Sequence, residues 1–184
     1  MYSNPEQKEY SFMNNVIEAI KSRRSIRKYK SEMIPRETIR NIVEAATYSP
    51  TGRNSQSPIM VVITDKALRD RLSQLNARIM GTDSDPFYGA PVVVLILALK
   101  QYHTYLYDGC SVIANLLLAA HSENIAGCWI HRAKEEFETA EGRAILKELG
   151  ITDEVEGVGH CILGYPDCEL PPPPPRKENY IIYR

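Results

Sequence analysis

The sequence predicts a three-layer fold of the α/β or α+β kind. Two apolar runs rich in β-branched residues, 59–64 and 92–99, have the length and composition of buried strands. Segments with apolar residues at three-to-four spacing, the pattern of amphipathic helices, alternate with these runs. The chain has 184 residues, of which 43% are hydrophobic, and no break in composition divides it. Residues 1–184 are therefore expected to form a single domain around one core.

Two amphipathic helices are expected before the first strand. Asn14 or Asn15 can cap the first helix, and Pro35 begins the second. The apolar face of the first helix consists of Val16, Ile17 and Ile20, and that of the second of Ile39, Ile42, Val43 and Ala46. The turn-forming run 49–52 ends the second helix.

The middle of the chain alternates strands with helices. Strand 59–64 precedes a helix that Asp65 caps and whose apolar face holds Leu68, Leu72, Leu75 and Ile79. Strand 92–99 is continuously apolar, as strands covered on both faces are, and is expected in the middle of a sheet. Asp108 begins the most hydrophobic helix. Its wide apolar stripe must be buried against the sheet or a second subunit, and consists of Val112, Ile113, Leu116, Leu117 and Ala120.

The last third of the chain combines short strands with an extended tail. Apolar residues 128–130 precede a helical region, 134–149, that Gly150 stops, and 157–164 is a further candidate strand. Five consecutive prolines, 171–175, must run as an extended segment, and 180–183 beyond them has the composition of one more strand. We therefore expect residues 170–184 to form a tail that reaches away from the domain, and the polar residues 1–12 to form a flexible start.

Composition argues against several classes of protein. With 22 basic and 23 acidic residues, the chain lacks the overall positive charge of nucleic-acid and membrane-surface proteins. The four cysteines form no CxxC pair and no zinc-ligand pattern, which indicates reduced thiols and no metal site. The start lacks the features of a signal peptide, and the longest apolar run, 90–99, is too short to span a membrane. A soluble, cytoplasmic protein is expected.

The clearest local signal is the basic stretch, residues 21–30. Six of its ten residues are Lys or Arg, and none is acidic. A solvated turn after a helix is one explanation, since a helix C-terminus attracts cations. An anion site is the other, because guanidinium forks match phosphate oxygens in pairs. The side chains available for such a site are those of Arg23, Arg24, Ser25 and Arg27.

Side chains would have to hold any phosphate, because the usual glycine-rich cradles are missing. The chain has no GxxxxGK[ST] motif, and the glycine pair Gly157 and Gly159 runs into a strand rather than from a strand into a helix. A second polar segment, 49–58, includes Asn54 and Gln56. Their carboxamides can pair with the alternating donor and acceptor edge of a flavin ring, although a plain turn is the other interpretation of this segment.

Four segments together resemble the nitroreductase family of FMN-dependent oxidoreductases. They are Arg23-Arg24-Ser25-Ile26-Arg27, Ser49-Pro50-Thr51-Gly52-Arg53-Asn54-Ser55-Gln56, Gly127-Cys128-Trp129-Ile130, and Gly164-Tyr165-Pro166 followed by Arg176-Lys177. They occur in the family's order and cover nearly the whole chain. The resemblance implies an α+β fold, a three-layer α/β/α sandwich with a central mixed sheet. It also implies a homodimer with two FMN sites at its interface, in which the C-terminal segment reaches the partner subunit.

The resemblance also assigns residues to FMN. Positions matching Arg23, Arg24, Ser25 and Arg27 contact the phosphate, the ribityl chain and the pyrimidine edge. The loop matching Pro50, Thr51, Asn54 and Gln56 reaches the flavin from the other subunit. The tail position matching Arg176, with Lys177, closes on the phosphate.

Three further positions complete this set. Asn76 resembles a helix residue that bonds the flavin pyrimidine, although an exposed helix residue is the alternative. Trp129 and Ile130 belong to the segment that leads to the reactive N5 edge of the flavin. After them the chain has His131-Arg132, where many relatives place glycine or another small residue. These two side chains either narrow the pocket or bind an anionic substrate, or else they point outward.

The implied activity is an FMN-dependent oxidoreductase that passes electrons from NAD(P)H to nitroaromatic compounds, quinones or similar small acceptors by a ping-pong mechanism. A non-catalytic FMN-binding carrier or sensor is the alternative. Because the flavin N5 carries the hydride, no catalytic side chain is expected.

Overall fold

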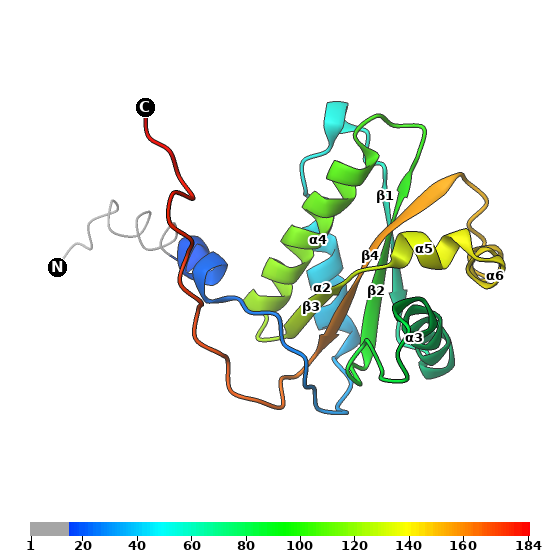
Figure 1. Ribbon diagram of the computed structural model, residues 1–184, viewed down its shortest axis with the longest axis horizontal. Helices are drawn as coiled ribbons and strands as arrows, with labels where there is room; N and C mark the ends of the chain where they lie inside the picture. Colours follow the sequence, from blue (N-terminus) through cyan, green and yellow to red (C-terminus); the bar gives the residue numbers. More distant parts are fainter. Residues whose placement is uncertain (1–14) are drawn as a thin grey trace.

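The computed structural model describes residues 15–184, so the predicted flexible start at 1–12 lies outside the described residues. Within residues 15–184 the chain forms a sheet with helices on both faces (Figure 1). The predicted α+β class and its three layers are confirmed. Across the same residues no helix is long and apolar enough to cross a membrane.

The sheet has four strands in the order β1-β2-β4-β3. Their bounds are β1 (Pro58–Ile63), β2 (Val92–Leu99), β3 (Ala126–Ile130) and β4 (Val155–Gly164). β2 lies between β1 and β4, and its residues 92–98 are buried, as a continuously apolar strand requires. Both of its neighbours pair with it antiparallel, and β3 pairs with β4 in the same way.

The sheet of the single chain therefore differs from the predicted mixed sheet. Among residues 15–184 the one parallel pairing is an isolated bridge between Ser25 and Gly127. The predicted strand at 180–183 is also absent from the single chain, where these residues have no strand structure and are exposed. A strand needs a second backbone to supply its hydrogen bonds, and the tail runs away from the sheet (Figure 1).

One face of the sheet is covered by α2 (Arg36–Thr47) and α4 (Tyr105–Ser122). The predicted apolar stripe of α4 packs here, with Ile113 and Leu116 fully buried. The other side of α4 exposes Tyr107, Cys110 and Ala114. The stripe is thus buried against the sheet, and a different side of the helix remains open to a second subunit.

The other face is covered by α3 (Lys66–Met80), α5 (Ala133–Glu138) and α6 (Ala140–Glu148). Asp65 caps α3 as predicted, accepting the N–H of Leu68 at 2.8 Å. The predicted helical region 134–149 is two helices, because Thr139 has an extended backbone and caps α6 by accepting the N–H of Gly142. Only glycine fits at this corner, since a Cβ at position 142 would lie 2.0 Å from the Glu136 carbonyl oxygen.

Two segments lie outside the three layers. The helix over residues 15–22 and the tail beyond Pro171 run close together away from the sheet (Figure 1), and Arg24 Nε donates to Pro171 O at 3.2 Å. The predicted apolar face of this helix is exposed, at 46% for Val16, 46% for Ile17 and 59% for Ile20. The tail exposes apolar side chains too, with Ile182 at 71%. Exposed apolar side chains on both segments are a feature of interaction surfaces.

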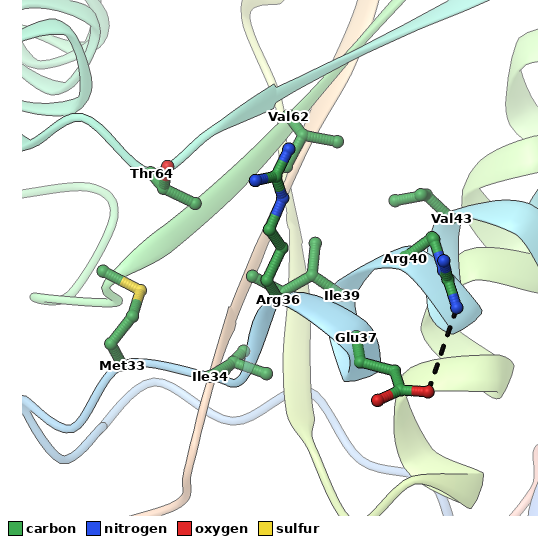
Figure 2. Close-up of a pocket in the computed structure, with 9 residues that line it drawn as sticks. All are labelled: Met33, Ile34, Arg36, Glu37, Ile39, Arg40, Val43, Val62 and Thr64. Carbon is green, nitrogen blue, oxygen red and sulfur yellow. Dashed lines mark ion pairs between the residues drawn. The ribbon is translucent and has the colours of Figure 1, made fainter.

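A groove of about 1120 Å³ lies between α2 and the outer edge of β1 (Figure 2). Its lining includes the exposed apolar side chains of Met33 and Val62. β1 has no strand on its outer side among residues 15–184. The opposite edge of the sheet, β3, is partly covered, because Ile26 N–H donates to Gly127 O at 3.2 Å. β1 is therefore the open edge of the sheet.

Candidate cofactor site

The backbone of the basic stretch is fixed in place, while the side chains of Lys21, Arg27, Lys28 and Lys30 are exposed. Its backbone runs beside β3, where Ser25 bridges Gly127. Just before the arginines, Ser22 Oγ lies 2.8 Å from Nε2 of His121 in the last turn of α4. The stretch thus passes between the start of β3 and the C-terminal end of α4.

The two adjacent arginines have different surroundings. Arg24 is occupied, because its Nη1 donates to Lys21 O and Arg23 O, both at 2.7 Å, and its Nε to Pro171 O. Arg23, in contrast, has an unused donor, because its Nη1 is buried and has no hydrogen-bond partner within residues 15–184. A buried guanidinium nitrogen without an acceptor is energetically costly. Arg23 Nη1 is therefore available to donate to an acceptor from outside the described chain, such as an anion.

The surroundings of Arg23 favour an anion electrostatically. Burial, and then the nearby Arg23 and Arg24 cations, hold the pKa of His121 below its ordinary value. The same positive charges that disfavour protonation of His121 favour the binding of an anion nearby. Arg27, two residues beyond Ser25, is exposed, and its only side-chain bond in the described chain is a weak contact to Ser25 O at 3.4 Å.

The polar loop lies at the other end of α4 and has a strained backbone. Its short helix η1 (Gly52–Asn54) and the residues after it include three non-glycine residues with positive φ, namely Arg53 at 54°, Asn54 at 55° and Gln56 at 48°. Such conformations cost about 1–3 kcal/mol each and persist only where the surroundings fix them. Strain of this kind is concentrated at functional sites.

Asp108, buried in the first turn of α4, fixes this loop. One of its carboxylate oxygens accepts the Gly52 N–H at 2.9 Å, and the other accepts the Ser55, Ser57 and Thr104 hydroxyls at 3.1, 3.0 and 3.1 Å. Burial alone would raise the pKa of Asp108, but these bonds, the Gly52 N–H foremost, hold the pKa below its usual range. With its base anchored in this way, the loop exposes Pro50, Asn54 and Gln56.

The loop and the basic stretch do not meet within one chain. The loop is anchored to Asp108 and the basic stretch contacts His121, and these two positions of α4 lie about 20 Å apart at 1.5 Å per residue. The structure therefore brings Arg23, Arg24, Ser25 and Arg27 together at one end of α4. It places Pro50, Thr51, Asn54 and Gln56 together at the other end.

Comparison with protein families identifies the chain. The sequence model of the Nitroreductase family matches residues 20–81 and 78–165, which include the basic stretch, the polar loop and all four strands. The chain belongs to the nitroreductase family. The resemblance drawn from the four sequence segments is thereby confirmed.

Solved nitroreductases have the same fold. A nitroreductase with bound FMN from Bacteroides fragilis is 29% identical, with a TM-score of 0.82 over 93% of this chain and 99% of that one. One from Desulfitobacterium hafniense, also with bound FMN, is 26% identical, with a TM-score of 0.83 over 93% and 98%. A protein from Methanothermobacter thermautotrophicus, provisionally named NADH dehydrogenase/NAD(P)H nitroreductase, is 29% identical over 83% of this chain and 78% of its own length.

The remaining predicted site residues of this nitroreductase lie in different surroundings. Trp129 is 38% exposed and its indole lies against Gly159, where a Cβ would be 2.1 Å from Nε1. Ile130 is buried in the core, so only its backbone is available to a ligand. Arg176 and Lys177 lie in the exposed tail, where Arg176 donates to Pro174 O and Lys177 lies over the Tyr180 ring. Their predicted closure on the phosphate stays a prediction.

Asn76 is buried, so the alternative of an exposed helix residue is wrong. Its Nδ2 donates to His131 O at 2.8 Å and to Glu136, and its Oδ1 accepts from Arg132 Nε at 2.9 Å. Glu136 also bonds His160, at 2.8 Å between Oε2 and Nε2.

Sequence reasoning missed Glu136, His160 and the role of Asp108. A carboxylate inside an amphipathic helix and a histidine inside an apolar strand were the only signals.

In an Asp108→Ala variant the free energy of unfolding is expected to fall by about 2–4 kcal/mol, because four donors lose their buried acceptor. The pKa of Asp108 is lower in the folded state than in the unfolded state. Asp108 therefore contributes its full stabilisation of the fold at pH values above the unfolded-state pKa, and this stabilisation is lost as the pH falls through the folded-state pKa. Urea unfolding measured from neutral to acidic pH tests both points. Asp83→Ala, at an exposed position, is the control. Equal losses in the two variants would contradict the role of Asp108.

Proposed function

We propose that this nitroreductase is an FMN-dependent oxidoreductase that passes electrons from NAD(P)H to small acceptors such as nitroaromatic compounds or quinones, in a ping-pong cycle. The observation that carries the proposal is the buried Nη1 of Arg23, which has no hydrogen-bond partner within residues 15–184 and lies in an electropositive segment. A phosphate supplies the acceptor that this nitrogen lacks. The solved relatives from B. fragilis and D. hafniense, which contain bound FMN, support FMN as the phosphate-bearing group.

In this proposal the basic stretch binds and orients FMN. Arg23, with Arg24 and Ser25, holds the phosphate, and Arg27 places positive charge near the N1 and O2 edge of the ring. Arg176, with Lys177, closes on the phosphate from the tail. FMN, when bound there, would supply the hydride chemistry between NAD(P)H and the acceptor. No side chain of the protein has to act as an acid or a base.

The proposal requires a homodimer, because half of the predicted site lies at the far end of α4. A twofold axis across the exposed side of α4, at Cys110 and Ala114, pairs the two helices and brings the loop of each subunit to the basic stretch of its partner. Pro50, Thr51, Asn54 and Gln56 then reach the flavin from the second subunit. Trp129, with the Ile130 backbone, lies beside it. Asn76 contacts the pyrimidine only if its present bonds to Arg132 and Glu136 rearrange.

The exposed apolar tail has a place in the same dimer. Its residues 180–183 need a sheet edge in order to form the predicted strand, and β1 offers the open edge, beside the groove of Figure 2. We infer that the tail of each subunit pairs with β1 of the other. The cytoplasmic location predicted from the sequence stays a prediction.

Absorbance spectroscopy of the purified protein tests the proposal. After incubation with FMN and gel filtration, the protein is expected to carry a flavin spectrum that NADH or NADPH bleaches in the absence of oxygen, and that nitrobenzene or benzoquinone restores. A protein that takes up no FMN contradicts both flavin hypotheses. A protein that takes up FMN but is not bleached by either nicotinamide favours the carrier or sensor. Comparing the two nicotinamides also determines the electron donor.

A further inference from the structure

The turn that joins β3 to α5 is built around an arginine in an unfavourable conformation. Arg132 has φ 81°, in the left-handed region that glycine or asparagine occupies at much lower cost. Three hydrogen bonds fix this turn. Asn76 Nδ2 donates to His131 O, Arg132 Nε donates to Asn76 Oδ1, and Glu136 N–H donates to Arg132 O at 3.0 Å.

The group that holds Arg132 is fully buried. Asn76, Glu136 and His160 each have 0% exposure, and they come from α3, α5 and β4. The Asn76 carboxamide bonds Glu136, and Glu136 bonds His160. Burying a carboxylate and an imidazole in this way is costly, and His160 Nδ1 is buried with no hydrogen-bond partner within residues 15–184. Two helices on one face of the sheet and a strand of the sheet itself therefore hold Arg132 in place.

The two terminal nitrogens of Arg132, Nη1 and Nη2, are accessible. Arg132 makes its one side-chain bond within residues 15–184 through Nε, and neither Nη1 nor Nη2 is a buried atom without a partner. The side chain is half-buried, so its orientation is fixed while the fork of terminal nitrogens remains accessible. A turn that only had to connect β3 to α5 would need no guanidinium. Arg132 therefore combines a strained backbone with an accessible guanidinium, a combination that is concentrated at functional sites.

We infer that Arg132 binds a carboxylate on the electron acceptor. This inference rests on the proposed function. Arg132 follows β3, the strand that carries the half-exposed Trp129, so it lies at the end of the proposed flavin site. A planar guanidinium held by Nε presents two parallel N–H groups, which match the two oxygens of a carboxylate. The acceptor class is therefore an aromatic nitro compound or quinone that bears a carboxylate. Asn76, Glu136 and His160 are positioning residues for Arg132.

Matched acceptors test this inference. 4-Nitrobenzoate and 4-nitrobenzamide have the same shape and differ in charge. In the FMN-loaded enzyme, Arg132→Gln is expected to lower kcat/KM for 4-nitrobenzoate by about 10- to 100-fold, mainly by raising KM. The kcat/KM for 4-nitrobenzamide is expected to stay nearly unchanged. Arg132→Lys keeps the positive charge but loses the planar fork of the guanidinium. Its kcat/KM for 4-nitrobenzoate is expected to lie between those of wild type and Arg132→Gln. Arg143→Gln, an exposed arginine on α6, is the control for lost charge.

A binding measurement separates the two proposals. Benzoate, added to the oxidised FMN-loaded protein without nicotinamide, is expected to perturb the flavin absorbance of wild type at concentrations at least about tenfold lower than for Arg132→Gln. Equal benzoate affinity in these two proteins, or an equal loss of activity toward both nitro compounds, overturns the carboxylate site. A wild-type enzyme that reduces neither these two compounds nor benzoquinone contradicts the proposed function, and the benzoate titration then decides about Arg132 by itself.

Discussion

An Arg23→Ala variant is expected to bind FMN about 100-fold more weakly than wild type. Arg23 Nη1 is buried and has no partner in the described chain, so a bound phosphate would complete its bonding. A charge-assisted bond from guanidinium to phosphate contributes about 1.5–3 kcal/mol, which corresponds to between 10- and 150-fold in affinity. Titration of the apoprotein into FMN, followed by quenching of FMN fluorescence, measures this affinity directly.

Two other variants make the Arg23 result specific. Arg36→Ala removes the same charge at the groove beside β1, outside the basic stretch, and is expected to leave FMN affinity within about twofold. Arg24→Ala is expected to have a smaller effect on affinity than Arg23→Ala, because Arg24 already bonds three backbone carbonyls, and to loosen the tail at Pro171. Equal affinities of Arg23→Ala and Arg36→Ala would place the phosphate elsewhere.

The elements of the fold were predictable because their signals are local. The unbroken apolar run of β2 placed it in the interior of the sheet, and the apolar spacing of α3 and α4 identified the faces that are buried. Hydrophobic periodicity reports burial within a few residues of each position. The same local pattern did not separate α5 from α6, because their division depends on the backbone at Thr139 and on the close approach of Gly142 to Glu136.

The supports of the site were not predictable, because their partners are distant in sequence. Asp108 lies more than fifty positions from the Gly52 N–H that it accepts, and Asn76 is separated similarly from Arg132. A carboxylate in the first turn of a helix has an adequate local explanation as a favourable interaction with the helix dipole, so nothing in the sequence demanded another. Arg23 and Arg24, adjacent and chemically identical, became distinguishable only when the carbonyls around Arg24 were placed.

Replacing both tail isoleucines with aspartate, Ile181→Asp and Ile182→Asp, is expected to weaken the proposed homodimer by at least about 100-fold. Both side chains are exposed in the single chain, and burial of one such side chain contributes about 1.5–3 kcal/mol. Adjacent residues of a strand point to opposite faces, so the pair places a charge on the buried face in either register. Sedimentation velocity over a range of concentrations measures the dissociation constant.

The same substitutions are expected to lower FMN occupancy, although both lie outside the basic stretch. A monomer keeps Arg23 but loses the partner's polar loop, because the two segments lie at opposite ends of α4. Ala67→Asp with Gln74→Asp, both exposed on α3 across the sheet from α4, adds the same charge as a control. A tail variant that is monomeric yet keeps full FMN affinity would mean that one chain forms the whole site. A variant that remains dimeric would mean that the tail does not contribute to the interface.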